Sequence, residues 1–230
     1  MKGKIIVIEG LDGSGKSTQI EYLKNKLSGQ NVCQIKLPDY DSDSSALVKM
    51  YLRGDFGKKP EDVNAYAASA FYAVDRYANF KMKWKNNYDK GDIIISDRYT
   101  TSNAYHQATK IPKEDRAEFF YWLEDFEYGL MGIPEPDAVI FLDMPIEISQ
   151  KMMSKRYEGD ESKKDIHESN LDYLYKCRDA ALDAAQEMGW FVIECSDGNE
   201  PRSVEDIGNE IYRDCGTVLQ PEPGGAYAFP

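Results

Sequence analysis

The residues best suited to chemistry lie near the N-terminus, in the glycine-rich segment 10–18. It follows a β-branched run, precedes a helical pattern, and reads Gly10, Leu11, Asp12, Gly13, Ser14, Gly15, Lys16, Ser17 and Thr18. In a strand–loop–helix setting this spacing forms a loop whose backbone N–H groups hold phosphate oxygens. Lys16 would reach the β- and γ-phosphates, and the Ser17 hydroxyl would help to hold Mg²⁺. The segment therefore predicts a nucleoside triphosphate site.

A second pair with clear chemistry, Asp97 and Arg98, directly follows an apolar run that predicts a buried strand. Ligands of open parallel sheets bind at the carboxyl ends of the strands, where the first strand would also deliver the glycine-rich segment. If the two strands are neighbours, Asp97 lies beside Mg²⁺ and Arg98 beside the transferring phosphates. Asp97 could equally cap a helix, whereas an arginine that ends a buried strand needs an anionic partner. Asp143 could hold metal or cap a helix, and the following Pro145 favours the cap.

Two residue pairs with helical spacing have the chemistry to recognise a planar base. Tyr72 and Arg76 are four residues apart, so an aromatic ring and a guanidinium share one helix face. They could instead make a surface contact, or Arg76 could form a solvated pair with Asp75. Asn103 and Gln107 have the same spacing and could read the edge of a base or face water.

The elements that must position these residues alternate along the chain. Apolar runs predict five buried strands, at residues 4–9, 32–37, 92–96, 137–142 and 190–195. Helical spacing predicts helices near residues 15–28, 44–53, 61–88, 113–129, 145–156, 166–188 and 203–214. Alternation of this kind favours a three-layer α/β fold with a five-stranded parallel sheet flanked by helices. We expect one domain over residues 1–214, with a mobile lid at about 154–169 and an irregular tail at 215–230.

Composition disfavours several classes of protein. The 230 residues carry 28 basic and 40 acidic side chains, and this net charge of −12 disfavours nonspecific binding of nucleic acid. No apolar run approaches the roughly 20 residues of a membrane span, and the first strand begins too early for a signal peptide. The two histidines, His106 and His167, have no metal or carboxylate–serine constellation, which favours structural or lid roles. Reduced thiols in a cytoplasmic protein are indicated by four widely spaced cysteines, Cys33, Cys177, Cys195 and Cys215.

Taken together, these segments resemble the thymidylate kinase family of P-loop nucleoside monophosphate kinases. The resemblance runs through residues 3–212 and rests on EGLDGSGKSTQ, LPDY after the second strand, YL-x-G near Tyr51, FYAVDR at 71–76, SDRYTTSNAYHQ at 96–107, PDAVIFLDMP at 136–145, and the basic lid followed by Asp165 and Glu168. It implies the P-loop kinase fold and transfer of the γ-phosphoryl group of MgATP to dTMP, giving dTDP and ADP for dTTP biosynthesis. It also implies a homodimer formed through helices, which apolar positions in segments 61–88 and 113–129 would allow.

The resemblance further implies a role for each matching residue. Residues 10–18 would hold ATP, and Ser17 and Asp97 would hold Mg²⁺. The dTMP site would comprise Asp12, Tyr72, Arg76, Arg98, Asn103 and Gln107, with Tyr72 stacked on thymine and Arg76 hydrogen-bonded to it. The catalytic set would comprise Lys16, Asp97, Arg98 and Arg156. Some members carry a catalytic arginine at the loop position occupied here by Gly13, so the lid must supply that charge, from Lys155, Arg156, Lys163 or Lys164.

The chain departs from the family pattern in two places. Many members have an acceptor-phosphate arginine after the second strand, where this chain reads LPDY, and Lys36 and Arg53 are the candidates to replace it. The usual Asp-Arg-x-Glu of the lid is Asp-Ile-His-Glu at 165–168. The nearest alternative function is that of a deoxynucleoside kinase or of a monophosphate kinase with another acceptor. A more remote alternative is a binding switch driven by ATP.

Overall fold

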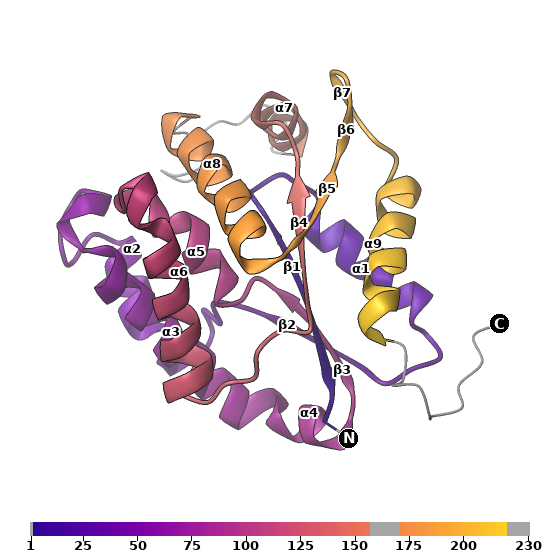
Figure 1. Cartoon of the computed structure of the whole chain (residues 1–230), viewed down its shortest axis with the longest axis horizontal. Helices are drawn as coiled ribbons and strands as arrows, with labels where there is room; N and C mark the ends of the chain where they lie inside the picture. Colours follow the sequence, from indigo (N-terminus) through magenta and orange to yellow (C-terminus); the bar gives the residue numbers. More distant parts are fainter. Residues whose placement is uncertain (1, 157–170, 220–230) are drawn as a thin grey trace.

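The computed structural model describes residues 2–156 and 171–219, which surround a five-stranded parallel sheet with the strand order β2-β3-β1-β4-β5 (Figure 1). The strands are β1 (Lys4–Gly10), β2 (Val32–Lys36), β3 (Ile93–Asp97), β4 (Ala138–Asp143) and β5 (Phe191–Glu194). The central strand β1 pairs with β3 on one side and with β4 on the other. The predicted parallel sheet of five strands is therefore confirmed.

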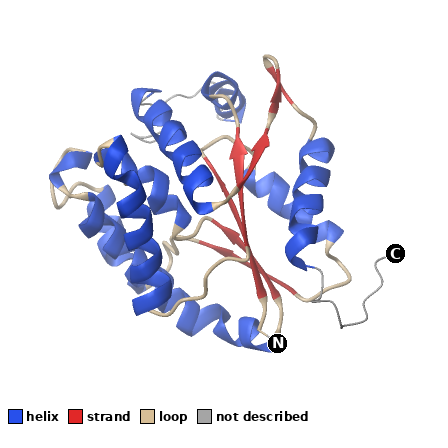
Figure 2. Cartoon of the chain, in the orientation of Figure 1, coloured by secondary structure: helices blue, strands red, loops and turns tan. Residues whose placement is uncertain are grey.

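Helices cover both faces of the sheet, which makes three layers (Figure 2). On one face, α1 (Lys16–Lys26) and α9 (Val204–Leu219) pack over Ile6 and Ile8 of β1. On the other face, α5 (Thr101–His106), α6 (Arg116–Glu124) and α8 (Leu171–Met188) pack over Ile5 and Val7. The alternation of β1 side chains between two apolar layers is the pattern of a strand that is buried on both sides.

The remaining elements complete the outer layers. The other helices are α2 (Ala46–Leu52), α3 (Ala65–Asn79), α4 (Lys85–Lys90) and α7 (Ile146–Arg156). Two π-helical segments, Phe80–Trp84 and Asp125–Leu130, continue α3 and α6. Short 3₁₀ turns occupy Asp43–Ser45, Pro60–Asp62, Ala108–Lys110 and Lys113–Asp115. A small antiparallel hairpin, β6 (Ser196–Asp197) and β7 (Glu200–Pro201), follows β5.

The helices differ from the predictions in several places. The helix expected over residues 61–88 is divided into α3, a π-helical turn and α4, and that expected over 113–129 into a 3₁₀ turn, α6 and a π-helical turn. The helix α5, which was not among the predicted helical segments, follows β3. Residues 215–219 were assigned to the irregular tail, but they belong to α9, where Cys215 is fully buried and anchors the last turns against the sheet. The lid prediction lies outside the described residues from 157 to 170, and its first residues, 154–156, end α7. Within residues 2–156 and 171–219, none of the helices combines the length and the apolar character that a membrane span requires.

Candidate active site

A pocket of about 430 Å³ opens at the carboxyl ends of β1, β2 and β3. Its volume lies within the range typical of small-molecule sites. The glycine-rich loop forms one end, and side chains of α3 and α5 form the other. Most predicted site residues with described side chains line this pocket, namely Asp12, Gly13, Gly15, Lys16, Ser17, Thr18, Tyr72, Arg76, Asp97, Arg98, Asn103 and Gln107.

The glycine-rich loop has the conformation that a phosphate site requires. Gly13 and Gly15 have φ values of 80° and 91°, which side-chain-bearing residues rarely adopt. The helix α1 begins at Lys16 and has no acidic residue in its first turn, so its N-terminal N–H groups remain favourable to an anion. The Lys16 ammonium group donates to the carbonyl oxygens of Gly10 and Leu11, at 2.8 and 3.0 Å. Burial, together with the nearby Arg98, lowers the pKa of Lys16 to about 8.

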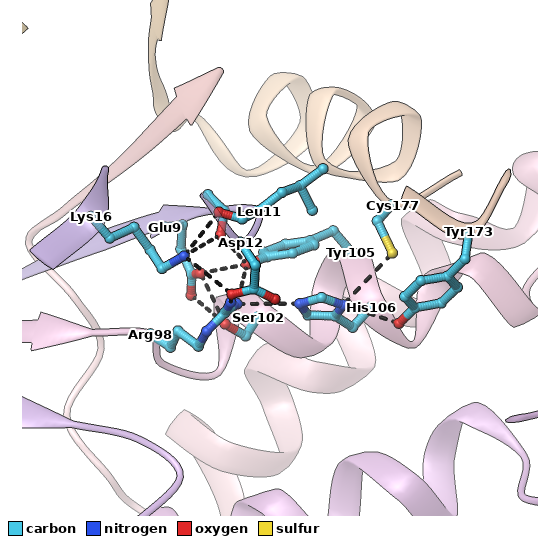
Figure 3. A network of polar contacts seen from close by, with 11 residues as sticks. Glu9, Leu11, Asp12, Lys16, Arg98, Ser102, Tyr105, His106, Tyr173 and Cys177 are labelled. Carbon is cyan, nitrogen blue, oxygen red and sulfur yellow. Dashed lines mark hydrogen bonds and ion pairs between the residues drawn. The ribbon is translucent and has the colours of Figure 1, made fainter. Parts of the chain in front are cut away.

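Arg98 stands between the loop and the rest of the pocket. Its Nη2 donates to Asp12 Oδ1 at 2.7 Å, and its Nη1 donates to Tyr105 Oη at 2.8 Å (Figure 3). Burial favours the neutral form of Asp12, but the charges of Arg98 and Lys16 outweigh it and hold the pKa of Asp12 well below its ordinary value. Arg98 adopts a φ of 69°, a strained conformation for a residue with a side chain. Such strain is typical of a side chain that its surroundings hold in a functional position.

A buried carboxylate that the sequence analysis missed, Glu9, fixes the segment around Arg98. Glu9 is fully buried at the end of β1. It accepts hydrogen bonds from the Tyr99 N–H, the Thr101 and Ser102 hydroxyls, and the Tyr105 hydroxyl. It therefore joins the strand that carries the glycine-rich loop to the start of α5. The sequence feature that could have identified Glu9 is its place as an acidic residue within an otherwise apolar strand. A buried charge there requires hydrogen-bonding partners.

At the far end of the pocket, Tyr72 and Arg76 lie together, as their spacing predicts. The Tyr72 ring stands edge-on to Tyr51, with the ring centroids 6.4 Å apart. Arg76 is only 3% exposed, and its Nε and Nη2 donate to the two carboxylate oxygens of Glu127 at 2.6 and 2.5 Å. The alternative of a solvated pair with Asp75 is wrong, because Asp75 is fully buried and accepts from the Asp39 N–H and the Ser44 hydroxyl.

The amide side chains of Asn103, in α5, and of Gln107, at the C-terminal cap of that helix, also line the pocket. Asn103 and Gln107 are 2% and 4% exposed, so the alternative that they face water is wrong. Asn103 Nδ2 lies 3.4 Å from the Ser69 carbonyl oxygen. The Oε1 atom of Gln107 is buried and has no hydrogen-bond partner among the described residues. An acceptor in this state is available to a donor group of a ligand.

Ser17 and Asp97 line the same pocket, at the start of α1 and the end of β3. A hydroxyl and a carboxylate are oxygen ligands of the kind that Mg²⁺ prefers, and Mg²⁺ commonly takes its other ligands from water and nucleotide phosphates. No cluster of three or more histidine, cysteine or acidic side chains suited to a metal occurs within residues 2–156 and 171–219. The residues therefore fit a Mg²⁺ ion that arrives with a nucleotide.

Of the other candidate residues, one lines the pocket and the rest do not or have side chains outside the described part of the chain. Asp143 does not act as the expected helix cap, because its carboxylate pairs with Arg178 Nε and Nη2 at 2.6 and 2.7 Å. Lys36 lines the pocket, whereas Arg53 is exposed and pairs with Asp55. Arg156 is the last residue of α7, and its side chain lies outside the described part of the chain, as does all of the lid from 157 to 170.

The pocket lining also includes residues that were not predicted as site residues, among them Lys110 and His106. Lys110 donates to the Tyr51 hydroxyl and to the Val63 carbonyl oxygen, at 3.0 and 2.8 Å, and burial lowers its pKa to about 8. His106 lies in the pocket wall, with its Nε2 only 3.2 Å from Arg98 Nη1. His106, for which a structural or lid role was predicted, thus lies next to an arginine of the pocket. His167 lies outside the described residues.

Comparison with known proteins agrees with this geometry. The thymidylate kinase family model matches residues 8–210. A thymidylate kinase of Mycobacterium tuberculosis is 27% identical over 191 residues, which cover 81% of this chain and 87% of that protein. One of Caenorhabditis elegans is 32% identical over 160 residues, which cover 64% of this chain and 66% of that protein. The solved thymidylate kinase of Candida albicans shares the fold, with a TM-score of 0.68 and 22% identity over 94% of this chain and 92% of that one. The chain therefore belongs to the thymidylate kinase family.

Proposed function

We propose that this enzyme transfers the γ-phosphoryl group of MgATP to dTMP and releases dTDP and ADP. The observation that carries the proposal is that one pocket joins a phosphate-binding loop to a separate aromatic and amide-lined end, with Arg98 between them. A donor triphosphate at the loop and a nucleoside monophosphate at the far end would bring their phosphates together beside Arg98. Family membership supports the same phosphotransferase activity.

The donor site consists of residues 10–18 and the start of α1. We propose that the loop N–H groups and Lys16 bind the ATP phosphates, because Lys16 needs only to exchange two loop carbonyl oxygens for phosphate oxygens. Ser17 and Asp97 would hold Mg²⁺, which neutralises charge on the phosphates when bound. The lid, through Arg156 or a neighbouring lysine, would supply a further cation over ATP, since the loop itself carries Gly13 instead of an arginine.

The acceptor site lies at the other end. Tyr72 would stack on thymine, while Arg76, Asn103 and Gln107 would hydrogen-bond to the base and the deoxyribose. The aromatic rings of Tyr51 and Tyr72 in the pocket lining and the unpartnered Gln107 oxygen support a planar, hydrogen-bonding ligand there. Asp12 would contact the acceptor near its sugar and phosphate. Lys36 is the better of the two candidates for the missing acceptor-phosphate arginine, because it lines the pocket and Arg53 does not.

Catalysis in this site consists of alignment and charge neutralisation. The phosphate of a monophosphate acceptor is mostly dianionic near neutral pH, so its oxygen can attack without a strong general base. Arg98 is held by Asp12 and Tyr105 before any substrate arrives, so it needs little reorganisation to meet the charge that develops in transfer. Lys16 would hold the donor phosphates in line with the acceptor.

We also propose a homodimer in the cytoplasm. Exposed apolar side chains gather on α3 and α6, where Val74 and Tyr121 are 46% and 70% exposed. A second copy of the chain would cover such a surface. Sedimentation equilibrium tests it, and a monomer at micromolar concentration would refute it. The free state of all four cysteines supports a reducing compartment.

The experiment that tests the activity is coupled release of ADP from MgATP, with dTMP, dUMP, dCMP, dGMP, AMP and thymidine as parallel acceptors. A strong preference for dTMP is the expected result. A preference for thymidine or for another monophosphate would keep the kinase and reassign the acceptor. If no acceptor is phosphorylated while a protein partner stimulates ATP hydrolysis, the binding switch is the correct function.

A further inference from the structure

We propose that His106 is a positioning residue that holds the Arg98 guanidinium in place for phosphoryl transfer, and that it does so only as a neutral imidazole. The inference rests on the proposed kinase activity. It assigns a task to a side chain that is not part of the donor or acceptor sets above.

His106 links the catalytic end of the pocket to the helix that follows the lid. Its Nε2 lies 3.2 Å from Arg98 Nη1, and its Nδ1 lies 3.1 Å from the Tyr173 hydroxyl of α8 (Figure 3). Cys177 Sγ, also on α8, is 3.6 Å from the same Nδ1. The imidazole ring stacks on Tyr173 with an angle of 20° between the planes, and its centroid is 4.4 Å from that of Tyr105. The ring is thus fixed from both sides.

These contacts define the protonation state of the ring. A guanidinium group has only donors, so His106 Nε2 must accept the hydrogen bond from Arg98. The single proton of the neutral ring then sits on Nδ1, where it is donated to the Tyr173 oxygen. A protonated ring has no acceptor and would place a second positive charge against Arg98.

Three side chains around the ring are uncharged near neutral pH. Burial raises the pKa of Tyr105 and of Tyr173 well above the ordinary value, and that of Cys177 to about 12, so these three stay uncharged. Among the described residues, Asp12 interacts electrostatically with the ring, and the charged groups around the neighbouring Arg98 include Glu9, Asp12 and Asp97. The Asp12 carboxylate favours a protonated ring, whereas the guanidinium of Arg98, 3.2 Å from Nε2 and bonded to Asp12 at 2.7 Å, opposes it. Glu9 is bonded to the Tyr105 hydroxyl and not to the ring.

The arrangement leaves one edge of Arg98 for an anion. The two hydrogens of Nη1 are taken by Tyr105 and His106, and one hydrogen of Nη2 is taken by Asp12. Nε has no acceptor among the described residues, so Nε and the second Nη2 hydrogen remain for a phosphate. A guanidinium held in this way offers two donors in a fixed orientation, the geometry that phosphate recognition uses. Without His106, Nη1 keeps only its hydrogen bond to Tyr105 and its orientation is less closely fixed.

Two substitutions separate the hydrogen bond from the packing. His106→Phe keeps a stacked ring but removes both nitrogens, whereas His106→Gln places an amide oxygen near the position of Nε2. At pH 7.5 we expect His106→Phe to lower kcat/KM for dTMP about tenfold, the scale of one lost hydrogen bond to a charged group. His106→Gln should retain activity within about threefold. The thermal midpoint and the KM for ATP report whether either variant is damaged elsewhere, and both should be unchanged.

A double-mutant cycle asks whether His106 acts through Arg98. In an Arg98→Ala background, His106→Phe should cost less than about twofold, because its target is gone. The pH profile supplies a second readout. The acceptor phosphate takes up one proton at about pH 6. As the pH is lowered, kcat/KM of the wild type should therefore fall with the uptake of two protons, one by the phosphate and one by His106, and that of His106→Gln with the uptake of about one.

The outcomes are distinct. An inactive wild type would overturn the proposed kinase activity, on which this inference rests. Full activity of His106→Phe, equal losses in the phenylalanine and glutamine variants, or an unchanged loss in the Arg98→Ala background would each overturn the positioning role. The same acid slope in the wild type and in His106→Gln would overturn the requirement for a neutral ring.

Discussion

The buried ion pair of Arg76 and Glu127 should contribute strongly to the stability of the fold. Glu127 is fully buried and accepts two hydrogen bonds from Arg76 and one from the Thr100 hydroxyl. Glu127→Gln removes the negative charge and leaves the buried guanidinium without compensation. Breaking a buried ion pair from one side costs about 3–5 kcal/mol. We expect a loss of about 3 kcal/mol in the free energy of unfolding, because the glutamine oxygen still accepts one hydrogen bond.

The assay is urea denaturation, with kcat and KM for dTMP measured on the same preparations. The matched control is Asp55→Asn, which breaks the exposed pair with Arg53 and should cost less than about 1 kcal/mol. A second variant, Arg76→Met with Glu127→Leu, removes both charges and should recover much of the free energy of unfolding. Its KM for dTMP should be higher than that of the wild type, because Arg76 is absent. A loss below about 1 kcal/mol in Glu127→Gln, or a double variant that is less stable than the single one, would refute the reasoning.

Three further predictions concern the pocket. Arg98→Ala should lower kcat/KM by an amount that corresponds to a loss of about 2–4 kcal/mol of transition-state stabilisation. A fall in kcat/KM of less than about tenfold would remove Arg98 from the catalytic set. Lys110 has a pKa lowered to about 8, so its charge is present below that pH and lost above it. Because Lys110 lines the same pocket as the proposed acceptor site, loss of its charge should weaken binding of an anionic acceptor. The KM for dTMP should therefore rise as the pH passes 8, and Lys110→Met should abolish that rise. Gly13→Ala should raise the KM for ATP more than about tenfold, because a Cβ there would lie 2.8 Å from Met153 Cγ at a φ of 80°. Gly29→Ala, where a Cβ meets nothing within 4 Å, should leave that KM unchanged.

The parts of the fold that the sequence predicted are those with a strong local pattern. The apolar runs identified all five strands, and most clearly the central strands β1, β3 and β4, because strands buried on both faces tolerate few polar residues. The edge strands β2 and β5 are only partly buried. The glycine spacing of residues 10–18 located the loop in the same way. By contrast, α5 was missed, since Thr101, Ser102 and Asn103 are weak helix formers and tertiary contacts with Glu9 hold them in place.

The sequence predicted many of the residues that line the pocket but not the partners to which they are hydrogen-bonded. The spacing of Tyr72 and Arg76 placed both at the pocket, yet Glu127, the partner of Arg76, is 51 residues further along the chain. Similarly, Asp143 was separated from Arg178 by 35 residues, and a local pattern could not choose that partner over a helix cap. Long-range ion pairs of this kind depend on the packing of whole helices and leave no periodic signal.

The turn after β3 is held by two buried carboxylates from opposite sides. Tyr99 and Thr101 bond to Glu9, while the residue between them, Thr100, bonds to Glu127. Glu127 also binds Arg76, which belongs to the proposed acceptor site, and Glu9 binds the segment that follows Arg98. On these proposed roles, selectivity for the base and the rate of transfer would be coupled through residues 98–101. Redesign of the base preference through Arg76 and Glu127 should consequently slow the reaction even with a well-fitting new acceptor, and directed evolution of such variants should gather second-site changes in the turn.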